Sequence, residues 1–242
     1  PVHLGALGLC VRTVSSSREW REGDMVVVNH PAFGGSHLPD VTLISPVFVR
    51  GELIAFVANR AHHAEIGGRA PGSMPATATS LEEEGVVLAP ALLFEEGESR
   101  FHEIESIFRS ARYPSRMLSD NLADLAAQAA ANHHGVRSMQ VLVEGSSREA
   151  VVRNMVGLCE RAARVMKAQL RAQDDCEWQM EDELDDGTPI RVSLRSSGGT
   201  LQVDFAGSGP VHAGNLNATE AIVRSAVLYV LRAWLAEDMP LN

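Results

Sequence analysis

The segment Asn29–Ser73 reads NHPAFGGSHLPDVTLISPVFVRGELIAFVANRAHHAEIGGRAPGS. Its middle holds two runs rich in β-branched and apolar residues, 41–49 and 53–60, and residues 50–52 between them have the composition of a turn. We therefore predict an antiparallel hairpin whose open end carries the two polar clusters of the segment.

The pairing of the two strands depends on the length of their loop. A two-residue loop pairs Asp40 with Ala61, and a three-residue loop pairs Asp40 with His62. Pro46 has no backbone N–H, so its strand is expected to be an edge strand or to carry a bulge, and a bulge would shift the pairing by one residue. In each case Asp40 lies beside the run 61–63.

Side chains that can bind a metal gather at this open end. His37 precedes Asp40 by three residues, so a tight bend can aim both at one point, and one of His62 and His63 can join them. Two histidines and one carboxylate leave open positions on a zinc, manganese or iron ion, which favours a catalytic metal site. The alternative is that the histidines are solvated or bonded to backbone carbonyls, because the dense motif H-E-x-x-H is absent.

The same region resembles a known family. The run from Gly23 to Pro75 is similar to the signature region of the hydantoinase B and oxoprolinase family, whose pattern passes through G-D, N-D-P, G-G-T-H-x-x-D, H-H-x-D-x-G-G and P-G-S. Other landmarks occur in the family's order, so the resemblance covers essentially the whole chain. They are PVHLG at 1–5, DFAGS at 204–208, GNLNAT at 214–219 and PLN at 240–242.

This resemblance implies a divalent transition metal at the matching positions. His37 and Asp40 match the H-x-x-D ligands, and His62 matches the third ligand in the segment A-H-H. Family members include ATP-dependent amidohydrolases of cyclic amides (N-methylhydantoinase, 5-oxoprolinase and caprolactamase) and the metal-bearing subunits of acetone and acetophenone carboxylases. Zinc, manganese and iron all remain candidates for the metal.

Three residues depart from the family's pattern, and His30 is the one that changes the type of charge. It stands where the family usually has the aspartate of N-D-P, while Ser36 replaces threonine and Glu65 replaces aspartate. If that aspartate orients a metal ligand or a loop in the family, His30 changes the surroundings of the ligands, which tune metal affinity.

His63 and Glu65 flank the third ligand and are candidates for a general acid or base. An imidazole or carboxylate within hydrogen-bond reach of an activated water suits that role. The alternative is that Glu65 accepts a hydrogen bond from a neighbouring N–H group and that His63 faces solvent. The glycines Gly34 and Gly35 allow either an anion-binding turn or a plain tight turn.

Composition limits the kinds of molecule that the protein can bind and the cellular compartment in which we expect it. The chain has 242 residues and a formal net charge of −10, which disfavours nucleic acid and anionic membrane surfaces because both need a basic face. No apolar run has the length of a membrane span and no secretory signal opens the sequence, so we expect a cytoplasmic protein. The cysteines Cys10, Cys159 and Cys176 indicate neither a disulfide framework nor a cysteine zinc site.

The element pattern predicts an α+β fold of mixed sheets and β-hairpins with packed helices. We divide the sequence into a β-rich lobe with the metal site at a hairpin mouth (1–110), a helical segment (111–175), and a β-meander with a C-terminal helix (176–242). The family resemblance implies that these segments are together the central part of a longer chain. Ser119 and Gly135 are the predicted caps of the first long helix. Further helices are expected at 148–171 and 220–235, and strands at 177–184, 190–194 and 201–205.

The sequence carries no G-x-x-x-x-G-K-[ST] phosphate loop, dinucleotide-binding glycine pattern or G-x-S-x-G motif. The resemblance implies that ATP is used by a partner, a hydantoinase A-type ATPase subunit or domain, in a hetero-oligomer. Three functions remain open. They are hydrolysis of a lactam or hydantoin ring amide, carboxylation of the acetone or acetophenone type, and a non-catalytic interaction module.

Overall fold

The computed structural model describes residues 3–235, and these residues form six α-helices and two antiparallel sheets. The predicted α+β class is therefore confirmed. The chain divides into two compact units, one made of residues 1–152 and 214–230 and the other of residues 153–213 and 231–242. The candidate site lies in the first unit.

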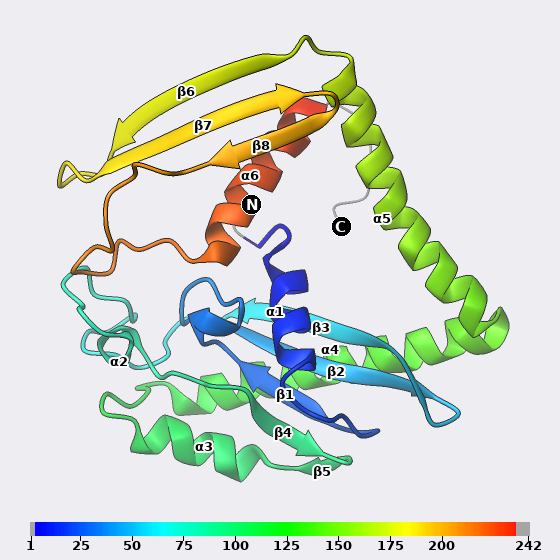
Figure 1. Cartoon of the computed structure of the whole chain (residues 1–242). Helices are drawn as coiled ribbons and strands as arrows, with labels where there is room; N and C mark the ends of the chain where they lie inside the picture. The colour runs from blue at the N-terminus through cyan, green and yellow to red at the C-terminus, as the bar shows by residue number, and fades with distance from the viewer. Residues whose placement is uncertain (1–2, 236–242) are drawn as a thin grey trace. The chain divides into compact units, whose positions relative to one another are not determined.

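The first unit is built on a five-stranded sheet (Figure 1). Every neighbouring pair of strands in it is antiparallel. The strand order is β3-β2-β1-β4-β5, with bounds β1 Met25–Val28, β2 Asp40–Val49, β3 Glu52–His62, β4 Ala91–Glu95 and β5 Glu98–Ser99.

The predicted hairpin is formed by β2 and β3. Its loop has two residues, Arg50 and Gly51, and both have positive φ, as the tight turns of hairpins require. A bulge near Val47 shifts the register, so Asp40 pairs with His62. The sequence had left this pairing open between Ala61 and His62, and the bulge that Pro46 suggested as one possibility is what decides it.

Strand β2 is an interior strand that carries a bulge, the second of the two alternatives that Pro46 had suggested. Strand β1 pairs with β2 only at residues 42–44, so Pro46 lies where β2 has a neighbour on one side alone. A proline that donates no hydrogen bond is tolerated there.

Helices cover both faces of the sheet. Helix α1 (Ala6–Ser15) lies on one face, where Cys10 and Val14 pack with Val26, Val28 and Ile44. Helices α3 (Phe101–Ser110) and α4 (Leu118–Gly145) lie on the other face and enclose the larger core (Figure 1). Alternate residues of a strand point to opposite faces, so Asp40 and His62 lie on the α1 side. The larger core includes Val27, Val41, Leu43, Phe108 and Leu125.

Helix α4 is longer than the sequence suggested. Ser119 lies inside its first turn and does not cap it, and Gly135 lies in its middle. The cap predicted at Gly135 is wrong because this glycine serves packing: a Cβ atom there would lie 2.7 Å from Cγ1 of Val57 on β3. The helix passes over the hairpin at this point.

Replacement of Gly135 by alanine is therefore expected to destabilise the protein. Alanine favours a helix over glycine by about 1 kcal/mol, but overpacking against the stiff Val57 side chain costs about 1–3 kcal/mol. The matched control is Gly157→Ala in α5 (Arg148–Arg171), where a Cβ atom would have no neighbour within 4 Å. Thermal unfolding should show a lower midpoint for Gly135→Ala and an unchanged or higher one for Gly157→Ala, and a rise for both would contradict the packing argument.

The remaining elements agree with the expected order. The predicted meander is present as the sheet β6-β7-β8, and its last turn contains Gly198 and Gly199 with positive φ. No helix between residues 3 and 235 combines the length and the apolar composition needed to cross a membrane. The bounds are η1 Pro31–Phe33, α2 Leu81–Glu84, α5 Arg148–Arg171, β6 Cys176–Glu183, β7 Pro189–Ser197, β8 Thr200–Asp204 and α6 Glu220–Leu235.

Candidate metal-binding site at the hairpin end

Asp40 is the centre of the candidate site. Its side chain is fully buried, and its Oδ2 atom accepts a hydrogen bond from Ser36 Oγ and lies 2.7 Å from His3 Nε2. Nδ1 of His37 lies 2.9 Å from the same oxygen. The bend at 37–40, closed by the bond from the Asp40 N–H to the His37 carbonyl, brings these groups together.

His62 completes the group from the second strand of the hairpin. It pairs directly with Asp40 in the ladder, and the rings of His37 and His62 lie 4.9 Å apart between centroids. The three metal ligands that the family resemblance implied therefore lie side by side. The exposed ring of His62 leaves the group open to solvent on one side.

Sequence reasoning did not identify His3 as part of this group. His3 precedes α1, and the packing of α1 on the sheet brings it to Asp40, 37 positions further along the chain. No periodicity or spacing links two such positions. The one signal was that His3 stands in the PVHLG landmark at the start of the family pattern.

The electrostatics of the group favour a charged Asp40. Burial alone would raise the pKa of this carboxyl group, but the neighbouring His37, Ser36 and His3 side chains outweigh burial and hold the pKa well below its usual range. Asp40 is therefore a carboxylate at neutral pH, the form that binds a cation.

The donor atoms fit a metal ion, although their present arrangement is not that of a preformed metal site. Among residues 3–235, no three His, Cys, Asp or Glu side chains are grouped as a ready set of ligands. However, Asp40 Oδ1 is buried and has no hydrogen-bond partner. Such atoms carry a cost unless another group satisfies them. An imidazole nitrogen and a carboxylate oxygen are both ligands that zinc, manganese and iron accept.

The loop before these residues is fixed by backbone contacts. Asn29 is buried and bonds the Leu38 and Val86 carbonyls and the Leu88 N–H. Gly35 approaches the backbone so closely that a Cβ atom there would lie 2.6 Å from the Asn29 carbonyl oxygen. Close packing is thus what Gly35 provides.

His30 has a local role that an aspartate could also fill. It is the N-cap of η1, and its Nδ1 atom accepts a hydrogen bond from the Ala32 N–H at 3.1 Å. Aspartate is among the preferred N-cap residues because its side-chain oxygen accepts the same bond. An aspartate at this position could therefore make the capping contact that His30 makes, and the hydroxyl of Ser36 bonds Asp40.

His63 points to the opposite side of the sheet from His62. It is fully buried against α4, with Nε2 3.1 Å from Gln128 Oε1 and Nδ1 3.1 Å from Asn121 Nδ2. Burial lowers the pKa of this imidazole. The structure places His63 in a polar contact with the helix and does not place it beside His37; its catalytic role stays a prediction.

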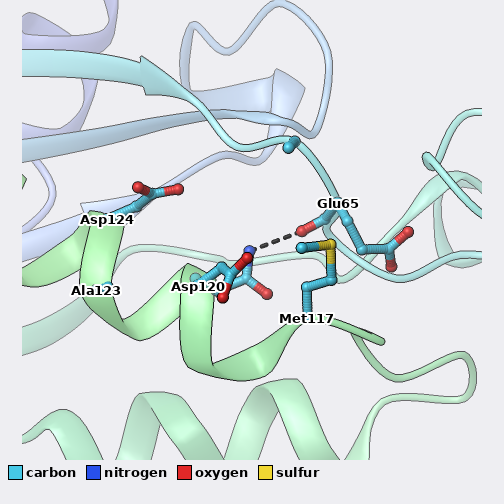
Figure 2. A pocket seen from close by; sticks show the side chains of 7 residues that line it. Glu65, Met117, Asp120, Ala123 and Asp124 are labelled. Carbon is cyan, nitrogen blue, oxygen red and sulfur yellow. Dashed lines mark hydrogen bonds between the residues drawn. The ribbon is translucent and has the colours of Figure 1, made fainter.

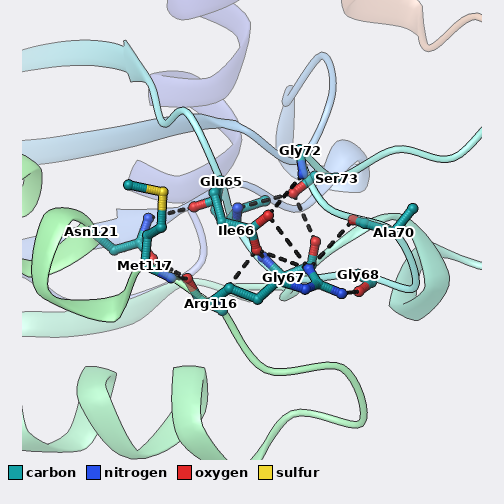
Figure 3. Close-up of polar contacts among 11 residues, drawn as sticks. Glu65, Ile66, Gly67, Gly68, Ala70, Gly72, Ser73, Arg116, Met117 and Asn121 are labelled. Carbon is teal, nitrogen blue, oxygen red and sulfur yellow. Dashed lines mark hydrogen bonds and ion pairs between the residues drawn. The ribbon is translucent and has the colours of Figure 1, made fainter.

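Glu65 is buried and organises the loop that follows it (Figure 3). Its carboxylate accepts the Gly67 N–H at 2.6 Å and the Gly72 N–H at 2.9 Å, and it pairs with Arg116 Nη1 at 3.1 Å. Arg116 also donates to the Gly68 carbonyl. These contacts match the alternative given for Glu65 from the sequence, and its role in proton transfer is likewise untested.

A pocket of about 250 Å³ lies between this segment and the start of α4 (Figure 2). Asp120 and Asp124 line it, and the Glu65 carboxylate points away from Asp124 towards its own loop. The pocket therefore offers two exposed carboxylates and no basic side chain. Its full lining is Ala64, Glu65, Met117, Asp120, Asn121, Ala123 and Asp124.

The model of the family Hydantoinase B/oxoprolinase matches residues 1–242. The chain belongs to this family. Among curated relatives, the 5-oxoprolinase of Saccharomyces cerevisiae is 39% identical over the whole chain, which spans 20% of that protein. The caprolactamase subunit beta of Pseudomonas jessenii is 31% identical over 71% of the chain and 29% of its own length. The chain thus spans about a fifth of the 5-oxoprolinases that it matches.

Two solved structures share the fold of this chain. The crystal structure of ATP-dependent caprolactamase from Pseudomonas jessenii superposes with a TM-score of 0.89 and 27% identity over 99% of this chain and 42% of that one. The nucleotide-free structure of acetone carboxylase superposes with a TM-score of 0.78 and 18% identity over 97% of this chain and 34% of that one. The second comparison bears on the fold alone.

Proposed function

We propose that this chain supplies the metal-holding part of an ATP-dependent enzyme that hydrolyses a cyclic amide. The observation that carries the proposal is the contact of His3 and His37 with the buried carboxylate of Asp40, beside its ladder partner His62, with Asp40 Oδ1 left without a hydrogen-bond partner. Membership of the hydantoinase B/oxoprolinase family supports cyclic amides as the substrate class.

In this proposal His37, Asp40 and His62 hold a divalent transition metal, and His3 is placed to contribute a further nitrogen. When bound, such a metal polarises a carbonyl group and makes water a stronger nucleophile. The chain itself keeps Asp40 ionised and oriented, because the Ser36 hydroxyl and the neighbouring histidines fix one of its oxygens. The open side at His62 leaves room for a small substrate.

The proposal places ATP use in a partner subunit or domain of the hydantoinase A type. Its support is indirect: the chain carries no phosphate-binding loop motif, one relative is named as a beta subunit, and a solved relative is described as ATP-dependent. Activation of the amide by the partner would precede hydrolysis at the metal-holding part. Where the partner is a separate subunit, the enzyme is a hetero-oligomer.

Replacement of His37 by alanine is expected to abolish most activity and to weaken metal binding. The loss of one imidazole leaves Asp40 and His62 in place, so a large excess of zinc or manganese should restore part of the activity. The assay measures ATP-dependent ring opening of 5-oxoproline, hydantoin or caprolactam by the complete enzyme with its partner. Full activity and full metal content in His37→Ala would remove His37 from the site.

Labelled bicarbonate separates hydrolysis from carboxylation in the same assay. Ring-opened product without label supports the proposal, whereas label in a new carboxyl group identifies a carboxylase. If metal binds and neither product forms with any substrate, the metal serves an interface and the chain is an interaction module.

A further inference from the structure

Three amide side chains of α4 form a buried polar surface against the hairpin. Asn121, Gln128 and Asn132 are spaced by seven and four residues, so they lie on one face of the helix, and each is at most 6% exposed. Amides on a buried face cost free energy unless all their groups are bonded. Here the hydrogen-bond partners determine the orientation of the amide groups, that is, the direction in which each oxygen and each NH₂ group points.

Gln128 can present only its carbonyl oxygen to His63. Its Nε2 group donates to the Val41 carbonyl at 3.0 Å and to Asn59 Oδ1 at 2.8 Å, which uses both of its N–H bonds. Oε1 is left facing His63 Nε2 at 3.1 Å. The imidazole must therefore carry its proton on Nε2 and donate it to Gln128.

Asn121 determines the hydrogen-bonding role of the other ring nitrogen of His63, Nδ1, which must be an acceptor. Its Oδ1 accepts a hydrogen bond from Ser115 Oγ, and its Nδ2 donates to the Glu65 carbonyl at 2.7 Å. A reversed amide would set its oxygen against that carbonyl, so the second N–H of Nδ2 faces His63 Nδ1. Nδ1 of His63 is consequently an acceptor that has no proton.

His63 also joins the two strand ends that carry the metal ligands. Its backbone N–H donates to the Pro39 carbonyl at 2.8 Å, next to Asp40, and its chain neighbour His62 pairs with Asp40. The imidazole thus ties α4 to both sides of the candidate site. Both ring nitrogens are used in doing so, which leaves no lone pair for a proton from substrate.

We propose that His63 is a positioning residue: a neutral imidazole with its proton on Nε2, locked by Gln128 and Asn121, that holds His62 and Asp40 in register for the metal. The proposal rests on the proposed metal site, and it replaces the general acid or base role that the sequence suggested for His63. The amides of α4 act on the site through this ring.

Nuclear magnetic resonance of the chain labelled with ¹⁵N-histidine tests the tautomer without any metal. The expected result is a neutral His63 ring at pH 7 with a protonated Nε2 and an unprotonated Nδ1. A proton on Nδ1, or on both nitrogens, would overturn the proposal, because either state points an N–H bond at the amide group of Asn121.

Zinc affinity, measured by competition with a zinc-binding dye, tests positioning. His63→Leu is expected to weaken zinc binding roughly 10–100-fold, and His63→Gln, which keeps an N–H for Gln128, is expected to recover part of it. The matched control is Asn132→Leu, which breaks buried bonds to Asn59 and Ser45 in the same interface but does not touch His63. Equal zinc affinity in His63→Leu and the unaltered chain would refute positioning.

Hydrogen exchange distinguishes a failure of the positioning proposal from a failure of the proposed metal site. In the absence of metal, His63→Leu should speed exchange of the Asp40 and His63 amides, and Asn132→Leu should leave both protected. If the unaltered chain binds no zinc, the metal site is wrong and these amides alone decide whether His63 holds the strand ends. Unchanged protection in His63→Leu would then reject it.

Discussion

Replacement of Asp40 by alanine should remove the metal from the purified protein and reduce ATP-dependent ring opening by at least about 100-fold. Asp40 is the one buried carboxylate of the group, and His3, Ser36 and His37 all contact it. Its loss leaves three imidazoles with no negative charge to balance a divalent cation. Inductively coupled plasma mass spectrometry of protein purified without chelator measures the metal directly.

Asp24 supplies the matched control for this experiment. It is also a buried aspartate, 3% exposed, but it bonds the Arg21 and Glu96 N–H groups at the start of β1, away from the histidines. Asp24→Ala should lose stability and retain its metal. Near-stoichiometric metal in Asp40→Ala, or no metal in the unaltered protein, would contradict the proposed site and favour the interaction module.

The sequence predicted the parts of the fold that depend on interactions between residues close together in the chain. The two runs rich in β-branched and apolar residues identified the hairpin, and the turn composition identified its loop, because both depend on neighbours in the sequence. The register could not be settled in advance, because Pro46 allowed either an edge position or a bulge, and the bulge near Val47 shifts the pairing by one residue. Gly135 was misassigned for a related reason: its neighbour Val57 belongs to another element.

In the candidate site, too, contacts within the hairpin could be predicted from the sequence and contacts between distant elements could not. His37 and Asp40 are three residues apart and the hairpin brings His62 to them, so the convergence followed from the strand pattern together with the resemblance. His3 depends on how α1 packs on the sheet, and His63 depends on the amides of α4. Contacts between elements that lie far apart in the sequence carry no local signature, which is why the sequence did not indicate the contact of His3 with Asp40 or the contacts of His63 with the amides of α4.

Replacement of Glu65 by alanine is expected to loosen the loop 65–73. The change leaves the Gly67 and Gly72 N–H groups and the Arg116 guanidinium without their shared partner. The buried Gly67 N–H left without a partner costs about 1–3 kcal/mol, whereas Gly72 is exposed and water can replace its bond. Because Arg116 is 40% exposed, its ion pair adds only about 0–1 kcal/mol, and we expect a total of about 1–4 kcal/mol.

Hydrogen exchange of the Gly67 and Gly72 amides measures this opening free energy, and Glu105→Ala is the control. Glu105 pairs with Arg109 one helical turn away on the surface, where such pairs contribute only about 0.3–0.5 kcal/mol. The experiment also discriminates between the two roles considered for Glu65. A general acid or base would leave the loop protected when replaced and reduce only the rate of ring opening, whereas the observed contacts require faster exchange at both glycines, since the carboxylate that binds their N–H groups is gone.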